Sequence, residues 1–261
     1  PQVAYWQKDN PNRNGFNSYL PSVMDFPLEQ AIHTALMEDE VFWNEGMTRI
    51  YTVLAQDFVY HDLSHMLTFF ANHDHARTGD TFKEDPARMK LALALLATVR
   101  GIPQLYYGDE MMFLERKDKP GSDGAKRIDF PGGWEGDACD LFTPEGRAAA
   151  RGEYASAAEL HDYTARLFNW RKGAKVLHDG KTLHFMTRDN TYAFFRYNDE
   201  DAVFVYVNNS DSEKCVPWEH YGEFAPVSVP ARDVISGGTL TLDPSLTVPA
   251  KSVLIAEYKR L

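Results

Sequence analysis

Residues 66–74, with the sequence MLTFFANHD, constrain the fold more than any other stretch. Met66–Ala71 is a short apolar run, as expected of a buried strand in a parallel sheet, and the polar residues Asn72, His73 and Asp74 follow it directly. In parallel α/β architectures, ligands bind where the carboxyl ends of the strands meet. The histidine and the carboxylate are therefore placed to meet a ligand; the alternative is a strand-end turn in which Asp74 caps a loop.

The segments around this stretch alternate between strand-like and helix-like patterns. Asp85 and Pro86 suit the start of a helix, and Gly101 suits the left-handed position at its end. Such alternation predicts a parallel sheet, either doubly wound or part of a (β/α)8 barrel, and the pattern alone leaves both open. The predicted elements are a strand at 22–26, helices at 28–37 and 45–56, a strand at 66–71, a helix at 86–100, a strand at 102–107 and a helix at 156–173.

The pattern changes after Gly173 to period-two alternation with turn residues between the runs. This indicates an all-β antiparallel sandwich. We therefore predict an α/β domain at residues 1–175 and a β-sandwich domain at residues 176–261. The predicted strands of the second domain are 182–186, 191–197, 202–207, 240–242 and 252–258.

Composition excludes several classes of function. The net charge is −11, which disfavours binding to the phosphate backbone of nucleic acid. No apolar run reaches the roughly 18 residues of a membrane span, so we expect no membrane partner. Cys139 and Cys215 lie far apart, and the nine histidines supply no convincing ligand set, so we expect no metal site and no cofactor.

Four short segments, in this order, resemble signatures of the alpha-amylase superfamily, and most closely its neopullulanase and cyclomaltodextrinase group. The resemblance implies that residues 1–175 form about strands six to eight of a (β/α)8 barrel and that residues 176–261 form the C-terminal β-sandwich of the family. The segments are VMDFPL at 23–28, FFANHD at 69–74 with Arg77 close behind, GIPQLYYGDE at 101–110 and RIDFPGGW at 127–134.

The resemblance also implies a retaining glycoside hydrolase acting on α-glucans such as starch, pullulan and cyclodextrins. Such enzymes use a carboxylate nucleophile and a carboxylic acid about 5–5.5 Å apart. Asp74 matches a third carboxylate, which stabilises the transition state, and His73 and Asn72 lie beside it as substrate-binding candidates. Arg77 is either part of that site or a surface ion-pair residue. Trp134 either stacks on a sugar ring or pins its loop.

The same comparison places the nucleophile and the acid before Pro1. We therefore expect the chain to be inactive alone, as the C-terminal part of an active parent enzyme, and family habit suggests a periplasmic or secreted location. Glu110 is expected to anchor a strand-to-loop corner, and Arg127-Ile128-Asp129 to be loop structure. An unclosed barrel would leave a sheet edge exposed, which favours self-association.

The sequence is also compatible with two rival hypotheses. One is a non-catalytic carbohydrate-binding protein whose β-domain carries the site. The other is an unrelated doubly wound hydrolase or transferase that uses His73 and Asp74. The absence of a glycine-rich phosphate loop and of a Gly-x-Ser-x-Gly motif weakens the second.

Overall fold

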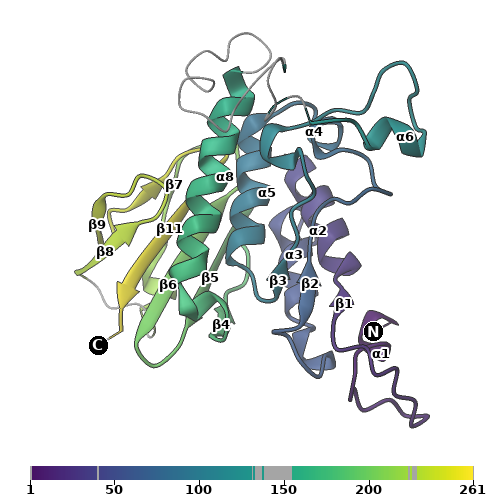
Figure 1. The fold of residues 1–261 in the computed structure, drawn as a ribbon. Helices are drawn as coiled ribbons and strands as arrows, with labels where there is room; N and C mark the ends of the chain where they lie inside the picture. The colour runs from purple at the N-terminus through teal and green to yellow at the C-terminus, as the bar shows by residue number, and fades with distance from the viewer. Residues whose placement is uncertain are drawn as a thin grey trace.

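The structure is a computed structural model that describes residues 2–39, 41–130, 132, 137, 155–222, 224 and 228–260. Figure 1 shows a small parallel sheet with helices around it, and a large antiparallel sheet beyond helices α5 and α8. The parallel part comes first in the chain and the antiparallel part second, which confirms the predicted fold class.

The parallel sheet has three strands in the order β1-β2-β3. These are β1 (Val23–Met24), β2 (Met66–Thr68) and β3 (Ile102–Pro103), each shorter than the apolar run that predicted it. Within the described residues, β1 and β3 each pair only with β2, so the sheet has two open edges. The predicted self-association would use such edges and stays a prediction.

The helices of this part lie between and beside the strands. Helix α5 begins as the sequence predicts, because the Asp85 side chain accepts a hydrogen bond of 2.9 Å from the Ala87 N–H and Pro86 occupies the first turn. The helices are α1 (Gln2–Tyr5), α2 (Phe26–Met37), α3 (Met47–Leu54), α4 (Thr78–Thr81), α5 (Pro86–Thr98), α6 (Asp123–Lys126) and α8 (Ala155–Gly173), with short 3-10 turns η1 (Asp57–Val59), η2 (Asp109–Met111) and η4 (Lys175–Leu177). A further 3-10 turn, η5 (Trp218–His220), lies in the antiparallel part.

The antiparallel part is a six-stranded sheet in the order β4-β5-β6-β11-β8-β9, with a separate two-stranded sheet of β10 and β7. Strands β5, β6 and β11 form its centre and are the longest. The bounds are β4 (Lys181–His184), β5 (Thr191–Tyr197), β6 (Asp201–Asn208), β7 (Lys214–Cys215), β8 (Val229–Asp233), β9 (Thr239–Leu242), β10 (Thr247–Val248) and β11 (Ser252–Lys259).

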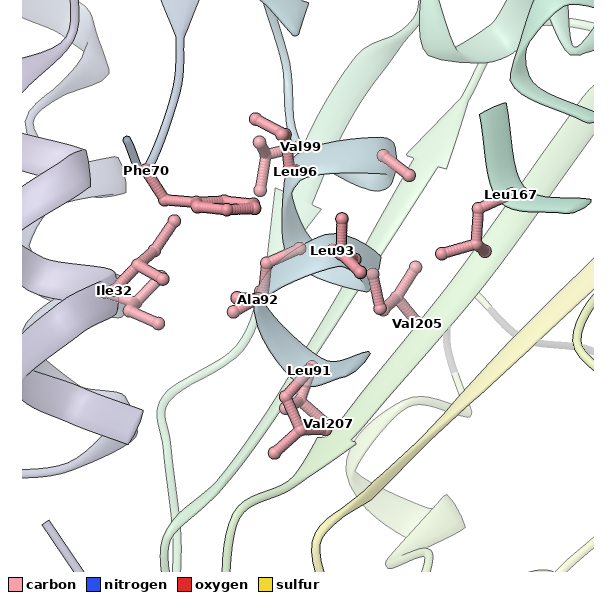
Figure 2. Close-up of a cluster of buried hydrophobic side chains, with 14 of the residues drawn as sticks. Ile32, Phe70, Leu91, Ala92, Leu93, Leu96, Val99, Leu167, Val205 and Val207 are labelled. Carbon is pink, nitrogen blue, oxygen red and sulfur yellow. The ribbon is translucent and has the colours of Figure 1, made fainter. Parts of the chain in front are cut away.

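Both faces of the large sheet are buried, and strand β6 shows how. Alternate side chains of a strand point to opposite faces. Val203, Val205 and Val207 belong to a core shared with α5 and α8, whereas Phe204 and Tyr206 belong to a second core on the other face. Figure 2 shows side chains of α5 and β6 meeting in the shared core. The helical part and the sheet are therefore joined by one continuous apolar core.

The junction between α5 and β3 depends on two adjacent residues. Gly101 has φ +95°, and a Cβ there would collide with the carbonyl oxygen of Met66, so the position requires glycine. Arg100 is buried and donates to Asp25 at 2.6 Å and to Asp57 at 2.9 and 2.5 Å. Asp25 also caps α2 through the Leu28 N–H at 3.2 Å. One guanidinium thus ties together the segments that follow β1, α3 and α5.

Candidate active site

The polar cluster after β2 is held by a turn. The Asn72 side-chain oxygen accepts hydrogen bonds from the N–H groups of Asp74, at 2.8 Å, and His75, at 3.2 Å. Asn72 is buried, so its side chain sets the backbone of this turn. The alternative in which Asp74 itself caps the loop is wrong, since Asn72 does so and leaves the Asp74 carboxylate free for other partners.

His73 and Asp74 face solvent together. Their side chains are 60% and 63% exposed, and Nε2 of His73 lies 3.3 Å from Oδ1 of Asp74. The predicted pair is therefore brought together at the carboxyl end of β2, the middle strand of the parallel sheet. Such a pair presents an imidazole nitrogen and carboxylate oxygens to a ligand that carries hydroxyl groups.

Two basic residues complete this cluster. Arg127 donates to Oδ1 of Asp74 at 3.0 Å and to the His73 carbonyl at 3.3 Å, and Lys126 donates to the Asp74 carbonyl at 3.0 Å. Ser122 caps the short helix α6, which carries Lys126 at its end. The sequence predicted only loop structure here. The adjacent basic pair was the available signal, but nothing in the local sequence indicated which carboxylate it would meet.

A second layer of titratable groups lies behind the cluster. Nδ1 of His75 is 3.1 Å and Nδ1 of His33 is 3.3 Å from the same Glu29 oxygen. Burial raises the pKa of Glu29, and the adjacent His75 opposes that rise. Burial lowers the pKa of His33 to about 4, so this imidazole is neutral near pH 7. His75 joins this layer to the turn that carries Asp74.

The side chain of Arg77 is fully buried, so the alternative of a surface ion-pair residue is wrong. Its place as part of the site stays a prediction. Its Nη1 donates to the Tyr107 carbonyl at 2.5 Å and lies 4.0 Å from Asp109 Oδ1, and its guanidinium lies 4.2 Å from the centre of the Tyr106 ring. Arg77 therefore joins the turn after β2 to the segment after β3.

The segment after β3 is fixed by two acidic residues with separate roles. Burial raises the pKa of Asp109 to about 8, and Thr78 donates to its Oδ1 at 3.0 Å. Glu110 accepts a hydrogen bond from the Gly108 N–H at 2.8 Å, which confirms that it anchors this corner. Gly108 has φ +88°, and a Cβ there would collide with the ring of Phe113.

Of the two remaining candidate residues, Trp134 and Asp129, the structure describes only Asp129. Trp134 lies outside the described residues. Asp129 is exposed in a loop, as predicted. Within the described ranges, no three histidine, cysteine, aspartate or glutamate side chains come together as a metal site. The same part of the chain contains no helix long and apolar enough to cross a bilayer.

Two models of known protein families match this chain. The model of the family "Alpha amylase, catalytic domain" matches residues 11–209, and that of "Cyclo-malto-dextrinase C-terminal domain" matches residues 182–257. The chain belongs to the alpha-amylase family. The two matches overlap at residues 182–209, in strands that contribute to the shared core. The predicted division after residue 175 stays a prediction.

Individual relatives agree with this placement. The chain is 25% identical over 203 residues to a beta/alpha-amylase of Paenibacillus polymyxa, covering 75% of this chain and 14% of that protein. It is 23% identical to a cyclomaltodextrin glucanotransferase of Bacillus sp. (strain 1-1), covering 80% and 25%. An alpha-amylase from Geobacillus thermoleovorans, complexed with acarbose, has the same fold, with TM-score 0.67, 19% identity and coverage of 91% and 48%. The chain thus spans only part of the length of these relatives.

Proposed function

We propose that this chain is the C-terminal part of a retaining glycoside hydrolase that acts on α-glucans and that Asp74 is its transition-state-stabilising carboxylate. The observation that carries the proposal is the exposed cluster of His73, Asp74 and Arg127 at the carboxyl end of the middle parallel strand. Membership of the alpha-amylase family supports the reaction class.

In this proposal the residues of the cluster have distinct roles. Asp74 binds sugar hydroxyls and stabilises the positive charge that develops at the anomeric carbon. His73 donates a hydrogen bond to the sugar, and Arg127 orients the carboxylate through its contact of 3.0 Å. Asn72 and Arg77 position the turn from beneath. The nucleophile and the acid come from the parent protein outside residues 1–261, so the isolated chain is inactive.

The finer substrate class is neopullulanase-like or cyclomaltodextrinase-like. The match of residues 182–257 to a cyclomaltodextrinase C-terminal domain supports it. The acarbose complex of the Geobacillus relative supports an α-glucan ligand. Trp134 belongs to this proposal as a stacking residue. A periplasmic or secreted location stays our expectation for the parent, from the resemblance to the family.

The test is Asp74→Asn in the complete parent enzyme, with Asp129→Asn as the matched control. We expect turnover of soluble starch and β-cyclodextrin to fall by about 100-fold or more in the first variant, because a carboxylate that stabilises charge becomes neutral. The control, an identical change in an exposed loop, should keep normal turnover. Equal turnover in both variants, with unchanged circular dichroism, would remove Asp74 from the proposed role.

A further inference from the structure

Glu29 is a buried carboxylate next to the turn that carries Asp74. It lies in the first turn of α2, and its side chain is 9% exposed. Its Oε1 lies 3.1 Å from Nδ1 of His75 and 3.3 Å from Nδ1 of His33. Burying a carboxylate costs free energy, and apolar side chains at such places are often at least as stabilising as charged ones. Packing alone therefore does not explain this carboxylate.

His75 joins Glu29 to the turn at residues 72–75. The His75 N–H donates to the side-chain oxygen of Asn72 at 3.2 Å and to the Asn72 carbonyl at 3.3 Å. The imidazole ring lies beside the ring of Phe26, with 5.8 Å between the two ring centres. Phe26 and Glu29 both belong to α2, the helix that follows β1. The end of the turn is therefore held by the helix that follows the neighbouring strand.

The Asp74 carboxylate depends on this turn for its direction. The Asp74 side chain is 63% exposed, and the two side chains with which it pairs are 60% and 44% exposed. Exposed ion pairs contribute little free energy, so they fix a side chain only weakly. The turn, by contrast, is held by buried groups at both ends. Asn72 is buried at its start, and Glu29 is buried behind His75 at its end.

We propose that Glu29 is a positioning residue: by holding His75 it fixes the turn in the orientation that presents the Asp74 carboxylate to substrate. This inference rests on the proposed role of Asp74. A carboxylate that stabilises a developing charge must be placed accurately, and a misplacement of about 1 Å can lower a rate about 100-fold. The contact of 3.3 Å with His33, on the same face of α2, restricts the Glu29 side chain.

The first test is amide hydrogen exchange in the 261-residue chain, measured by NMR at Asp74 and His75. The N–H groups of both residues donate to Asn72 in the closed turn. Glu29→Ala removes the acceptor that faces Nδ1 of His75, so it should speed both exchange rates by about tenfold. Glu29→Gln keeps a carbonyl oxygen that accepts from the same Nδ1–H, so both rates should stay close to those of the wild type.

Glu38→Ala is the matched control for the exchange experiment. Glu38 follows the last turn of α2 and accepts hydrogen bonds of 2.7 Å from the Gly46 N–H and from Nε of Arg49. It thus ties the other end of the same helix to α3. Exchange at the turn should be unchanged in this variant, which separates the Glu29 contact from a general loosening of α2.

The second test is turnover of soluble starch by the complete parent enzyme. Glu29→Ala should lower kcat by about tenfold and change KM by less than about twofold, because the Asp74 carboxylate is needed most in the transition state. Glu29→Gln and the control Glu38→Ala should both keep kcat near that of the wild type. The double variant of Glu29→Ala with His75→Ala should have the same kcat as His75→Ala alone, because Glu29 acts through His75.

Three results would overturn the inference. They are unchanged exchange in Glu29→Ala, equal kcat values for Glu29→Ala and Glu38→Ala, and losses in kcat that add in the double variant with His75→Ala. If Glu29→Ala keeps its kcat while Asp74→Asn loses turnover, the positioning role fails and the proposed function stands. Normal turnover in Asp74→Asn would instead overturn the proposed function, and the positioning role with it.

Discussion

Replacing Arg100 with methionine removes the cation that three segments of the parallel part share. Arg100 is buried, and its guanidinium makes its three hydrogen bonds with the carboxylates of Asp25 and Asp57. Burial alone would lower the pKa of Arg100, but these two carboxylates raise it further than burial lowers it. Methionine fills a similar volume without the charge, so the change isolates the electrostatic contribution.

Arg100→Met should destabilise the fold because it leaves two carboxylates without their cation. Asp25 has no exposed side-chain surface, and the Asp57 side chain is 16% exposed, so both carboxylates stay buried without their cation. Removing one partner of a buried ion pair costs about 3–5 kcal/mol. Burial already raises the pKa of Asp57, so the loss of stability should shrink as pH falls and the stranded Asp57 carboxyl group takes up a proton.

Urea unfolding at pH 7, followed by tryptophan fluorescence, measures this loss. Arg116→Met is the matched control, because Arg116 pairs with Asp118 at 2.6 Å, but the two side chains are 49% and 56% exposed. Exposed pairs contribute little to stability, so this variant should unfold like the wild type. If Arg100→Met loses no more stability than Arg116→Met, the reasoning about the buried network is refuted.

Two further predictions concern backbone strain and pH. Gly101→Ala should lower the free energy of unfolding by more than about 2 kcal/mol. Alanine at positive φ costs about 1–2 kcal/mol, and its Cβ would also collide with the Met66 carbonyl. Gly121→Ala, at φ +72° in open space, should cost only about 1–2 kcal/mol in the same urea experiment, and equal losses would contradict the role of the collision. Asp109 has a folded-state pKa of about 8, above its ordinary value near 3.8, so the folded state holds the extra proton between these values. Wild-type stability should therefore fall as pH rises from about 4 to 8 relative to Asp109→Asn, and parallel stability profiles for the two proteins would contradict this assignment.

Local sequence signals predicted the order of the elements because each signal acts over a few residues. Asp85 and Pro86 fix the start of α5 wherever that helix packs. The apolar run at Met66–Ala71 is buried as predicted, apart from the half-buried Leu67, although only Met66–Thr68 form a strand of the sheet. Strand length depends on the neighbouring strands, which lie far away in the chain, so a local pattern overestimates it.

The site was predictable where its residues are close together in the sequence. His73 and Asp74 are adjacent in sequence, so their proximity in space follows directly. The contact between Asp74 and Arg127 joins residues far apart in the chain and depends on how the segment after β3 folds back. The burial of Arg77 could not be predicted, because nothing in its local sequence distinguishes a buried cation from a surface ion-pair residue.

The shared core also bears on how such chains could be rearranged in evolution or in the laboratory. A cut after α8 would separate the valine face of β6 from the surface of α5 that packs on it. Both fragments would then expose apolar surface to water. The transferable module is thus the sheet together with the helices α5 and α8 that cover it. Recombination that respects this module should give soluble chimaeras, whereas a crossover placed at the end of α8 should give insoluble ones.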